Sequence, residues 1–515
     1  MDEINSPLPP RRTNIPEEQP VEEKPTEEKV SEEILPQNRT EPIMVSSKPT
    51  GLPLAKAIIP RDNRGPITIA LIGLAIIALI LVVVKVLIPR LKGSGKTAGE
   101  KTIVYWGLWE DDSLINGVLA DFETKNPGIK VKYIKNSKID YRSRLQGRLA
   151  KDPEAEEVPD LFRFHSSWVP MMKNYLDAAP DETAQKLELE NDFYRVYQND
   201  LKIGKSYVGI PLMYDGLALF YNKDIIEKSQ MSLPRTWWDF QETATKVTVK
   251  DQNGKITVAG AGMGLADNVD HWSDILGLIM KQNGIDILNL DAATEAKLKN
   301  VLNFYTLFRT RDEVWNESLP TTTEMFASGK LAFYFGPSWR IFNLEEMKPT
   351  LNPQLEYEVI GVPQLPVLEE GEELSPETRL TDIQWATYWA EGVNARSKNQ
   401  KEAWKLLEFL AAKENLEVLY RTASQVRYFG ELYPRRSMGP MLTDNLKASA
   451  FLQGADSASS GYLSSRTYDA GLNDQMSDYF KNAINAIVFD KESSDSVVET
   501  LKKGIQQLKQ KYELR

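Results

Sequence analysis

The stretch TIVYWGLWEDDSLINGVLADFETKNPGIKVKYI, residues 102–134, decides the fold class. It begins with a short β-rich run, TIVYW, continues through a helical stretch, SLINGVLADFETKN, and ends on a second β-rich run, IKVKYI. Strands that alternate with helices in this way lie parallel in one sheet, with the helix crossing over its face. The stretch therefore predicts an α/β fold with a parallel pair of strands.

The chain beyond this stretch continues the mixture of strands and helices. Amphipathic patterns predict helices at residues 291–308, 399–415 and 495–512, and Thr236-Trp-Trp-Asp239 has the spacing of a capping box that opens another helix. The residues on these patterns that we assign to packing are Trp237, Trp238 and Trp404. About 410 residues of this kind exceed one hydrophobic core, so two α/β lobes are expected.

Composition excludes several classes of function. The net charge of -11 over 515 residues argues against general nucleic-acid binding, which needs a basic surface. The chain has no cysteine, which excludes disulfides and thiol catalysis, and its only histidines are His165 and His271. Two histidines without cysteine offer little for a zinc site, so we expect no metal and no cofactor.

The N-terminal part predicts a membrane anchor. Residues 1–65 are rich in Pro and Glu and predict a disordered tail. The run ITIALIGLAIIALILVVVKVLI, residues 67–88, is long enough to cross about 30 Å of hydrocarbon and predicts a transmembrane helix within residues 66–90. Residues 91–100 read as a tether. The long preceding tail and the absence of a cleavage site favour an uncleaved, single-pass anchor in the cell membrane.

Six stretches in a fixed order carry a resemblance to a known family. After residues 102–133 come VPDLF, YVGIPLMYDGLALFYNKDII, LPRTWWDFQETATKVT, MFASGKLAFYFGPSW and GVNARSKNQKEAWKLLEFL. Together they resemble the family 1 extracellular solute-binding proteins, the maltose-binding-protein-like receptors of ABC importers. The resemblance implies a two-lobed periplasmic-binding-protein-like fold of type II, covering nearly everything from residue 101 to the C-terminus.

The same resemblance implies how the chain divides between the lobes. Residues 101–213 and 361–413 would form lobe 1, and residues 214–360 and 414–515 would form lobe 2. The chain would cross near residues 212–215 and near 359–363, where a proline follows a β-branched run, and the lobes would close about these crossings.

The ligand residues follow from the resemblance and from the chemistry of sugars. Aromatic rings stack on the apolar faces of sugar rings, and carboxylates and amides bind the hydroxyls. The positions that fall in the family's cleft segments are Trp109, Glu110, Phe164, His165, Ser166, Asp215, Trp272, Trp339, Trp385, Arg466 and Tyr468. Core packing of each aromatic residue, and a solvated turn at Asp215, are the alternatives.

These expectations combine into a function. The resemblance implies a non-enzymatic, monomeric receptor that captures a small molecule and delivers it to the permease subunits of an ABC transporter. The abundant aromatic residues favour a sugar or oligosaccharide as the ligand, with peptides and polyols as alternatives. The N-terminus would be cytoplasmic, and the binding domain extracellular or periplasmic. A sensor or adhesin that signals through the tail, and a glycoside hydrolase with two paired carboxylates, are the alternatives.

Overall fold

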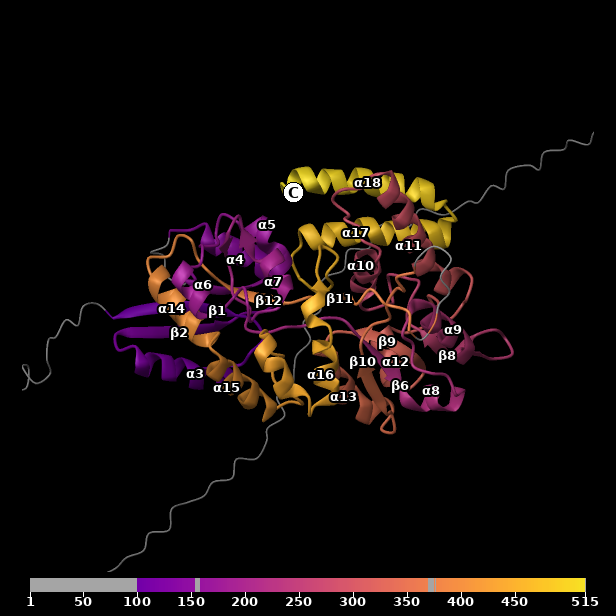
Figure 1. Ribbon diagram of the computed structural model, residues 1–515, viewed down its shortest axis with the longest axis horizontal. Helices are drawn as coiled ribbons and strands as arrows, with labels where there is room; N and C mark the ends of the chain where they lie inside the picture. The colour runs from indigo at the N-terminus through magenta and orange to yellow at the C-terminus, as the bar shows by residue number, and fades with distance from the viewer. Residues whose placement is uncertain (1–99, 153–157, 369–374, 376, 515) are drawn as a thin grey trace, which may run out of the picture. The chain divides into compact units, whose positions relative to one another are not determined.

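The computed structural model describes residues 100–152, 158–368, 375 and 377–514, which Figure 1 draws in colour. The predicted tail, the predicted transmembrane helix and all but the last residue of the predicted tether lie outside these residues. Within the described part of the chain, no helix has both the length and the apolar character that a membrane span requires.

The first sheet has four strands in the order β12–β3–β1–β2. Strands β1 (Lys101–Gly107) and β2 (Ile129–Lys135) run parallel, with α3 (Asp112–Lys125) between them in the chain. This arrangement confirms the parallel pair and crossover helix expected from residues 102–134. Strand β3 (Leu161–His165) is parallel to β1, and β12 (Trp389–Val393) pairs antiparallel with β3.

Helices pack on the first sheet through their apolar faces. Helix α3 buries Ile115, Val118, Leu119 and Phe122, which recur at helical spacing. It contacts α14 (Gln400–Leu410) and α15 (Lys413–Ser424), which come from much later in the chain. Sequence-distant segments therefore complete the first core.

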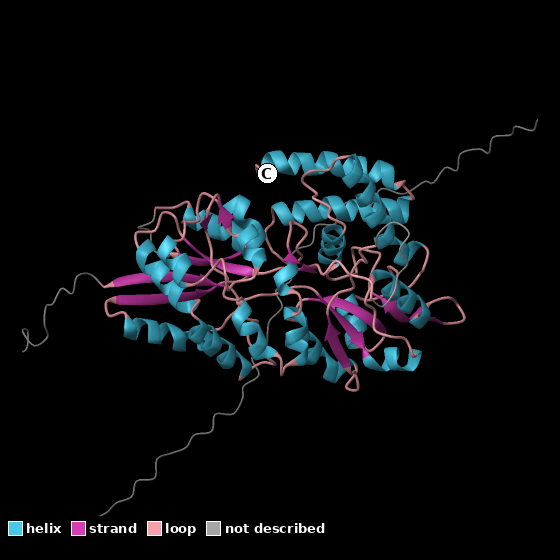
Figure 2. Ribbon diagram, viewed as in Figure 1, coloured by secondary structure: helices cyan, strands magenta, loops and turns pink. Residues whose placement is uncertain are grey.

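The second sheet has five strands in the order β10–β6–β9–β8–β7. Its central strand β9 is buried along its whole length, and β8 runs parallel to it while β6 runs antiparallel. These strands are β6 (Ala218–Asn222), β7 (Val249–Lys250), β8 (Ile256–Ala261), β9 (Leu331–Gly336) and β10 (Tyr357–Ile360). Figure 2 shows the two sheets as separate groups of strands, each surrounded by helices.

The chain passes between the sheets in two places that the structure describes. Ile210 still pairs with Glu391 of β12, whereas Ala218 already begins β6 of the second sheet. The chain leaves the second sheet after β10 and reaches the first again at β12. The exact lobe boundaries given above remain predictions.

Helix α9 (Trp237–Val247) tests two sequence expectations. The capping box is confirmed, because Thr236 Oγ1 accepts from Asp239 N and the Asp239 carboxylate accepts from Thr236 N. Trp237 and Trp404 are buried, as expected. The assignment of Trp238 to packing is wrong: its side chain is 52% exposed. Neighbouring residues on a helix point about 100° apart, so Trp238 faces away from the core that Trp237 enters.

The C-terminal part forms a helical pair. Helices α17 (Leu472–Asn485) and α18 (Ser494–Lys511) contact each other, and α18 also contacts α11 (Ala292–Thr310); all three lie together in Figure 1. The remaining α-helices are α4 (Tyr141–Leu149), α5 (Val169–Met172), α6 (Asp181–Lys186), α7 (Arg195–Asp200), α8 (Lys223–Ser229), α10 (Trp272–Gln282), α12 (Thr322–Ala327), α13 (Arg340–Leu351) and α16 (Leu446–Leu452). The short strands are β4 (Lys202–Ile203), β5 (Ser206–Tyr207), β11 (Gln384–Trp385) and β13 (Ala458–Ser459).

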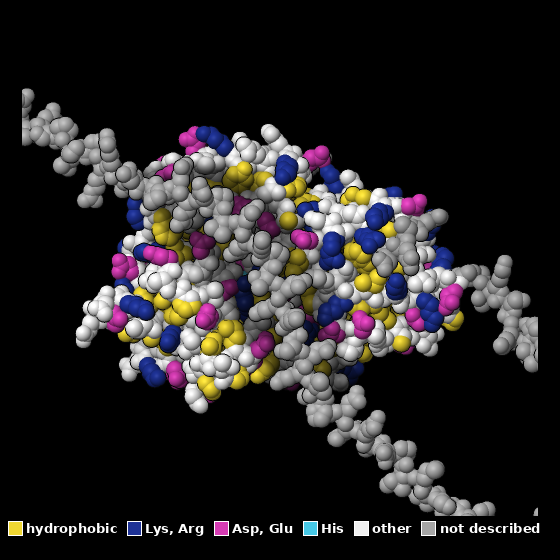
Figure 3. Space-filling view, turned by 180° about the vertical axis from the view of Figure 1, so that it is seen from behind, with side chains coloured by type: hydrophobic (Ala, Val, Ile, Leu, Met, Phe, Trp, Pro, Cys, Tyr) yellow, Lys and Arg dark blue, Asp and Glu magenta, His cyan; other side chains and the backbone are white. Residues whose placement is uncertain are grey.

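The surface carries charges of both signs. Figure 3 shows basic and acidic side chains interspersed over one face, with hydrophobic side chains scattered between them. Many of these charges form ion pairs between exposed side chains, for example Lys125 with Asp121 and Lys503 with Glu499. Exposed pairs of this kind contribute little stability, so the surface alone does not indicate a binding face.

Candidate functional site

Trp109 lies just after β1 in an aromatic cluster. Its ring contacts Trp389 edge-on at 5.2 Å between centroids, and the guanidinium of Arg163 lies 5.3 Å from its ring centroid. Trp389 also contacts the rings of His165 and Trp168, at 5.2 and 5.1 Å. With 37% of its surface exposed, Trp109 is the open edge of this cluster and could still contact a ligand.

Glu110 is part of a buried charge network. Arg163 is paired with both Glu110 and Glu391, and Tyr105 Oη donates to Glu391 at 2.7 Å. The second oxygen of Glu110, Oε2, is buried without a hydrogen-bond partner in the described part of the chain. A buried carboxylate that shares a guanidinium with a second carboxylate is chiefly structural, and only the Oε2 atom of Glu110 is left to accept a bond.

Phe164, His165 and Ser166 end β3 and begin the turn that follows it. Phe164 is fully buried, so it packs in the core. His165 Nδ1 lies 2.7 Å from Ser167 Oγ, and burial lowers the pKa of His165 to about 4. The imidazole is therefore neutral at physiological pH. Ser166 lies on the wall of the cavity described below.

Asp215 lies in the segment that links the two sheets. Its Oδ1 accepts from the backbone N–H groups of Gly216, at 2.8 Å, and Ser338, at 2.9 Å. Burial raises the pKa of the Asp215 carboxyl to about 7, although these two hydrogen bonds oppose the rise. The side chain thus joins the linking segment to the turn after β9.

Trp339 follows that turn and is surrounded by charged groups. The guanidinium groups of Arg340 and Arg466 lie 4.6 and 5.8 Å from its ring centroid, and the His271 ring meets it edge-on at 5.7 Å. The predicted residues Trp339 and Arg466 are therefore close together. Trp272, the next residue after His271, is partly buried at the start of α10.

Asp270 organises this cluster. It accepts from Arg340 Nη2 at 3.0 Å, Arg466 Nη2 at 2.9 Å and Thr323 Oγ1 at 2.7 Å. Burial alone would raise the pKa of Asp270, but Arg340 and the Thr323 hydrogen bonds outweigh it and hold the pKa well below its usual range. Asp270 therefore stays ionised and fixes both arginines.

The segment that carries Arg466 and Tyr468 has an unusual backbone. Arg466, Tyr468 and Ala470 all have positive φ, at 56°, 54° and 45°. Non-glycine residues rarely adopt this conformation, which costs about 1 kcal/mol or more at each position. Tyr468 also lies under Lys138, whose Nζ is 5.0 Å from the ring centroid, so the segment reaches residues next to the first sheet.

Trp385 lies in the short strand β11, which pairs with β13. The ring is 1% exposed, and its Nε1 donates to Asp274 Oδ1 at 2.9 Å. Only a thin edge of this indole can reach a ligand. Its position nevertheless matters, because it forms part of a cavity wall.

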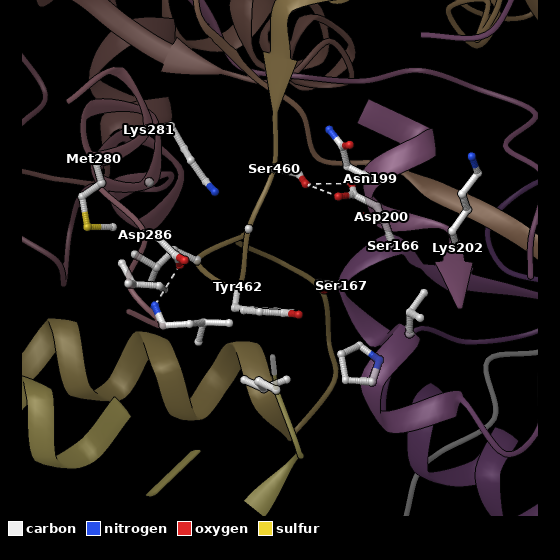
Figure 4. Close-up of a pocket in the computed structure, with 18 of the residues that line it drawn as sticks. Ser166, Ser167, Asn199, Asp200, Lys202, Met280, Lys281, Asp286, Ser460 and Tyr462 are labelled. Atoms are coloured by element: carbon white, nitrogen blue, oxygen red, sulfur yellow. Dashed lines mark hydrogen bonds between the residues drawn. The ribbon is translucent and has the colours of Figure 1, made fainter. Parts of the chain in front are cut away.

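A cavity of about 620 Å³ lies between segments that follow strands of both sheets (Figure 4). Residues from 166–173 and 199–204 line one side, residues from 277–288 line the other, and Trp385, residues 460–463 and residues 513–514 complete the wall. Of the residues predicted from the sequence, only Ser166 and Trp385 line it. The others lie in the aromatic cluster, in the Asp270 cluster and next to it, in the core, in the charge network of Glu110, or, for Asp215, in the segment that links the two sheets.

The polar groups of the cavity centre on Asp200. Its carboxylate accepts from Ser460 Oγ at 2.7 Å and from Tyr388 Oη at 2.8 Å, and burial raises its pKa to about 6. Figure 4 shows Tyr462 in the middle of the view and the Lys281 side chain pointing toward the segment that carries Ser460. The cavity thus combines an aromatic ring with hydroxyl, carboxylate and ammonium groups.

Sequence reasoning missed Asp200, Lys281, Ser460 and Tyr462. The aromatic, serine and glycine content of residues 458–462, ASSGY, was the one local signal, since such residues are common in binding loops. Within the described residues, no cluster of three or more histidine or acidic side chains has the arrangement of a metal site.

Comparisons with known proteins agree on the family and the fold. A model of the family described as bacterial extracellular solute-binding protein matches residues 106–417. A binding protein of Brucella abortus is 24% identical over 310 residues, covering 57% of this chain and 67% of its own. The galactooligosaccharide-binding protein of Bacillus subtilis is 25% identical over 366 residues, covering 66% of this chain and 75% of its own.

The solved structures extend the likeness over more of the chain. The sugar-binding protein MalE of Xanthomonas citri superposes with a TM-score of 0.61 at 17% identity, over 81% of this chain and all of that one. At this identity the likeness establishes the fold alone.

Proposed function

The chain belongs to the family of bacterial extracellular solute-binding proteins, and on this premise we propose that it binds a sugar or oligosaccharide in the cavity beside Tyr462. The observation that carries this proposal is the composition of the wall. Tyr462 supplies an aromatic ring, and Ser460, Asp200 and Ser166 supply oxygen atoms that can exchange hydrogen bonds with hydroxyl groups. Carbohydrate recognition needs this combination of a ring and convergent polar groups.

The size of the cavity and the relatives support the same ligand class. A volume of about 620 Å³ lies within the roughly 300–1,000 Å³ common for small-molecule sites. The relative in Bacillus subtilis is named for galactooligosaccharides, and the structural neighbour in Xanthomonas citri for sugars. We propose a binding role and no catalytic one, because the family is one of binding proteins.

Delivery and anchoring complete the proposal. We propose that the run at residues 67–88 anchors the chain in the cell membrane, with the binding part outside, and that bound solute passes to the permease of an ABC transporter. The support is the length and apolar character of that run in the sequence. Protease treatment of intact cells should then remove the large domain and leave a protected N-terminal fragment; a mature N-terminus after residue 90 would exclude the anchor.

Closure about the two linking segments is the motion we propose for capture. The segments near residues 212–215 and 359–363 would act as hinges between the lobes predicted from the sequence, and a ligand between two lobes stabilises the closed form. Small-angle scattering should show a smaller radius of gyration for the full chain in detergent when a saturating sugar is added. An unchanged radius at saturation would contradict closure.

Calorimetric titration of the full chain with galactooligosaccharides and maltooligosaccharides tests the binding proposal. At least one of these sugars should bind, and Tyr462→Ala should weaken its binding. Trp238→Ala is the matched control, because that aromatic side chain is exposed on α9 and does not line the cavity. Equal affinities for the wild type and Tyr462→Ala would remove the cavity from the proposal.

A further inference from the structure

Three lysines line the cavity, and two of them are already engaged. Lys173 is paired with Glu513, and Lys202 is paired with Glu190. Lys281 forms no ion pair or hydrogen bond with any of the residues the structure describes. The cavity therefore presents one ammonium group whose charge is not neutralised by direct contact.

The carboxylates of the wall are occupied by other partners. Asp200 accepts from Ser460 and Tyr388, and Asp286 accepts from Leu288 N at 3.0 Å and from the Asn289 side chain at 2.5 Å. Glu513 is engaged with Lys173. None of these acids makes a direct contact with Lys281. Asp200 attracts the ammonium only at longer range, and this attraction opposes the rise in the pKa of Asp200. The hydrogen-bonding positions of the ammonium are therefore left for something that enters the cavity.

The position of Lys281 explains how an unpaired cation is tolerated there. It lies in the last turn of α10, where the partial negative charge of a helix C-terminus stabilises a cation. Its stem passes Gly461, where an added Cβ would lie 3.9 Å from Lys281 Cε. Figure 4 shows the ammonium directed into the space between the Ser460–Tyr462 segment and Asp286.

We propose that the ligand of this cavity is an acidic sugar, one that carries a carboxylate or phosphate group which pairs with Lys281 while its ring lies against Tyr462. The inference rests on the proposed function and narrows its ligand class. A hydroxyl-bearing ring suits Ser460 and Asp200, and an anionic substituent suits the remaining ammonium. A neutral sugar would bring that ammonium no anionic partner and would leave it only the longer-range attraction of Asp200.

A comparison of the affinities for acidic and neutral sugars tests the inference. The full chain in detergent is titrated calorimetrically with trigalacturonic acid, with neutral galactotriose and with glucose 6-phosphate. A charge-assisted contact should make an acidic sugar bind about 10- to 100-fold more tightly than the neutral one. The preference should weaken as salt is added, because screening reduces the attraction.

Substitutions of Lys281 test whether its ammonium group causes the preference for an acidic sugar. Lys281→Met should abolish the preference for the acidic sugar over the neutral one, whereas Lys281→Arg should retain it. Lys228→Met removes the same charge from an exposed position on α8 outside the cavity and should change nothing.

Each outcome decides between the two proposals. Preference for trigalacturonic acid identifies a carboxylate ligand, and preference for glucose 6-phosphate identifies a phosphate. If the neutral sugar binds as tightly as the acidic ones and Lys281→Met changes none of these affinities, the proposal of an acidic ligand is wrong, and the proposal of sugar binding stands. If no sugar, acidic or neutral, binds the wild type, both proposals fail.

Discussion

The indole ring of Trp385 occupies the space that Gly277 leaves open on α10. A Cβ added to Gly277 would lie 2.5 Å from Cη2 of that ring, far inside contact distance. One turn earlier on the same helix, Asp274 accepts the Trp385 Nε1–H bond at 2.9 Å. The hydrogen bond to Asp274 holds one end of the ring, and the missing side chain of Gly277 leaves room for the other end. Strand β11 therefore packs closely against α10.

Gly277→Ala should destabilise the protein by about 1–3 kcal/mol, because the added methyl group meets a ring that its hydrogen bond to Asp274 holds in place. Alanine is otherwise favoured over glycine in a helix interior by about 1 kcal/mol, so the predicted sign is opposite to helix propensity. Thermal unfolding of the full chain, with tryptophan fluorescence as the signal, measures the change.

Gly117→Ala is the matched control for that substitution. Gly117 also lies inside a helix, α3, and an added Cβ there meets nothing within 4 Å. It should therefore stabilise the chain by up to about 1 kcal/mol. If the two alanine variants unfold alike, the close packing of Trp385 on α10 is wrong.

Asp215→Asn should stabilise the protein at alkaline pH. In the folded chain burial raises the pKa of Asp215 to about 7, whereas an unfolded aspartate has a pKa of about 3.9. Between these values the folded state binds more protons than the unfolded one, so the contribution of this group to stability falls as the pH rises. The amide oxygen of asparagine can still accept from Gly216 and Ser338 without a buried charge.

The melting temperature of the asparagine variant should exceed that of the wild type by about 2–5 °C at pH 8. The difference should shrink as the pH falls and vanish below about pH 3, where the wild-type carboxyl is protonated in both states. A constant difference across this range would show that the charge of Asp215 is not the cause.

Local patterns predicted the parts of the fold that depend on neighbouring residues. The β1–α3–β2 unit followed from 33 consecutive residues, and the Thr236 capping box from four. The error at Trp238 has the same origin: a helical pattern predicts that a residue lies on a helix, and its burial depends on which face meets the sheet.

The cavity could not be predicted in this way, because its wall is assembled from distant segments. Asp200 ends α7, Lys281 lies in the last turn of α10, and Ser460 follows β13. No spacing in the chain relates these residues, and their meeting depends on how the segments pack. Ser166 and Trp385, which line the cavity, were named through the family resemblance, which carries long-range information.

Asp270→Asn should be one of the most destabilising single substitutions among the residues that pack near the second sheet. It would leave Arg340, whose side chain is 8% exposed, without its carboxylate partner, and removing one partner of a buried pair costs about 3–5 kcal/mol. Chemical denaturation of the full chain measures this loss of unfolding free energy.

Arg466→Gln provides the comparison. The Arg466 side chain is 38% exposed, so its ion pair with Asp270 should contribute at most about 1 kcal/mol. Similar losses in both variants would mean that burial does not govern this cluster.

Two aromatic rings, those of Trp339 and Tyr462, are candidates for stacking against a sugar. The sequence placed a stacking ring at Trp339, whereas the cavity places one at Tyr462. In the structure the ring of Trp339 already lies beside the guanidinium groups of Arg340 and Arg466, which compete with a sugar for its faces.

We therefore expect Tyr462→Ala to weaken sugar binding about 10- to 100-fold, because roughly 100 Å² of apolar contact contributes about 2.5 kcal/mol. Trp339→Ala should change it less than about threefold. Calorimetry with the tightest-binding sugar compares the two variants, and circular dichroism checks that each remains folded. The opposite order, with a loss of 30-fold or more for Trp339→Ala and none for Tyr462→Ala, would return the binding site to the Asp270 cluster. The guanidinium groups of Arg340 and Arg466 would then have to move off the ring of Trp339 to admit the sugar. Substitution of Arg466 would change the affinity for sugar in that case, whereas a site in the cavity predicts no such effect.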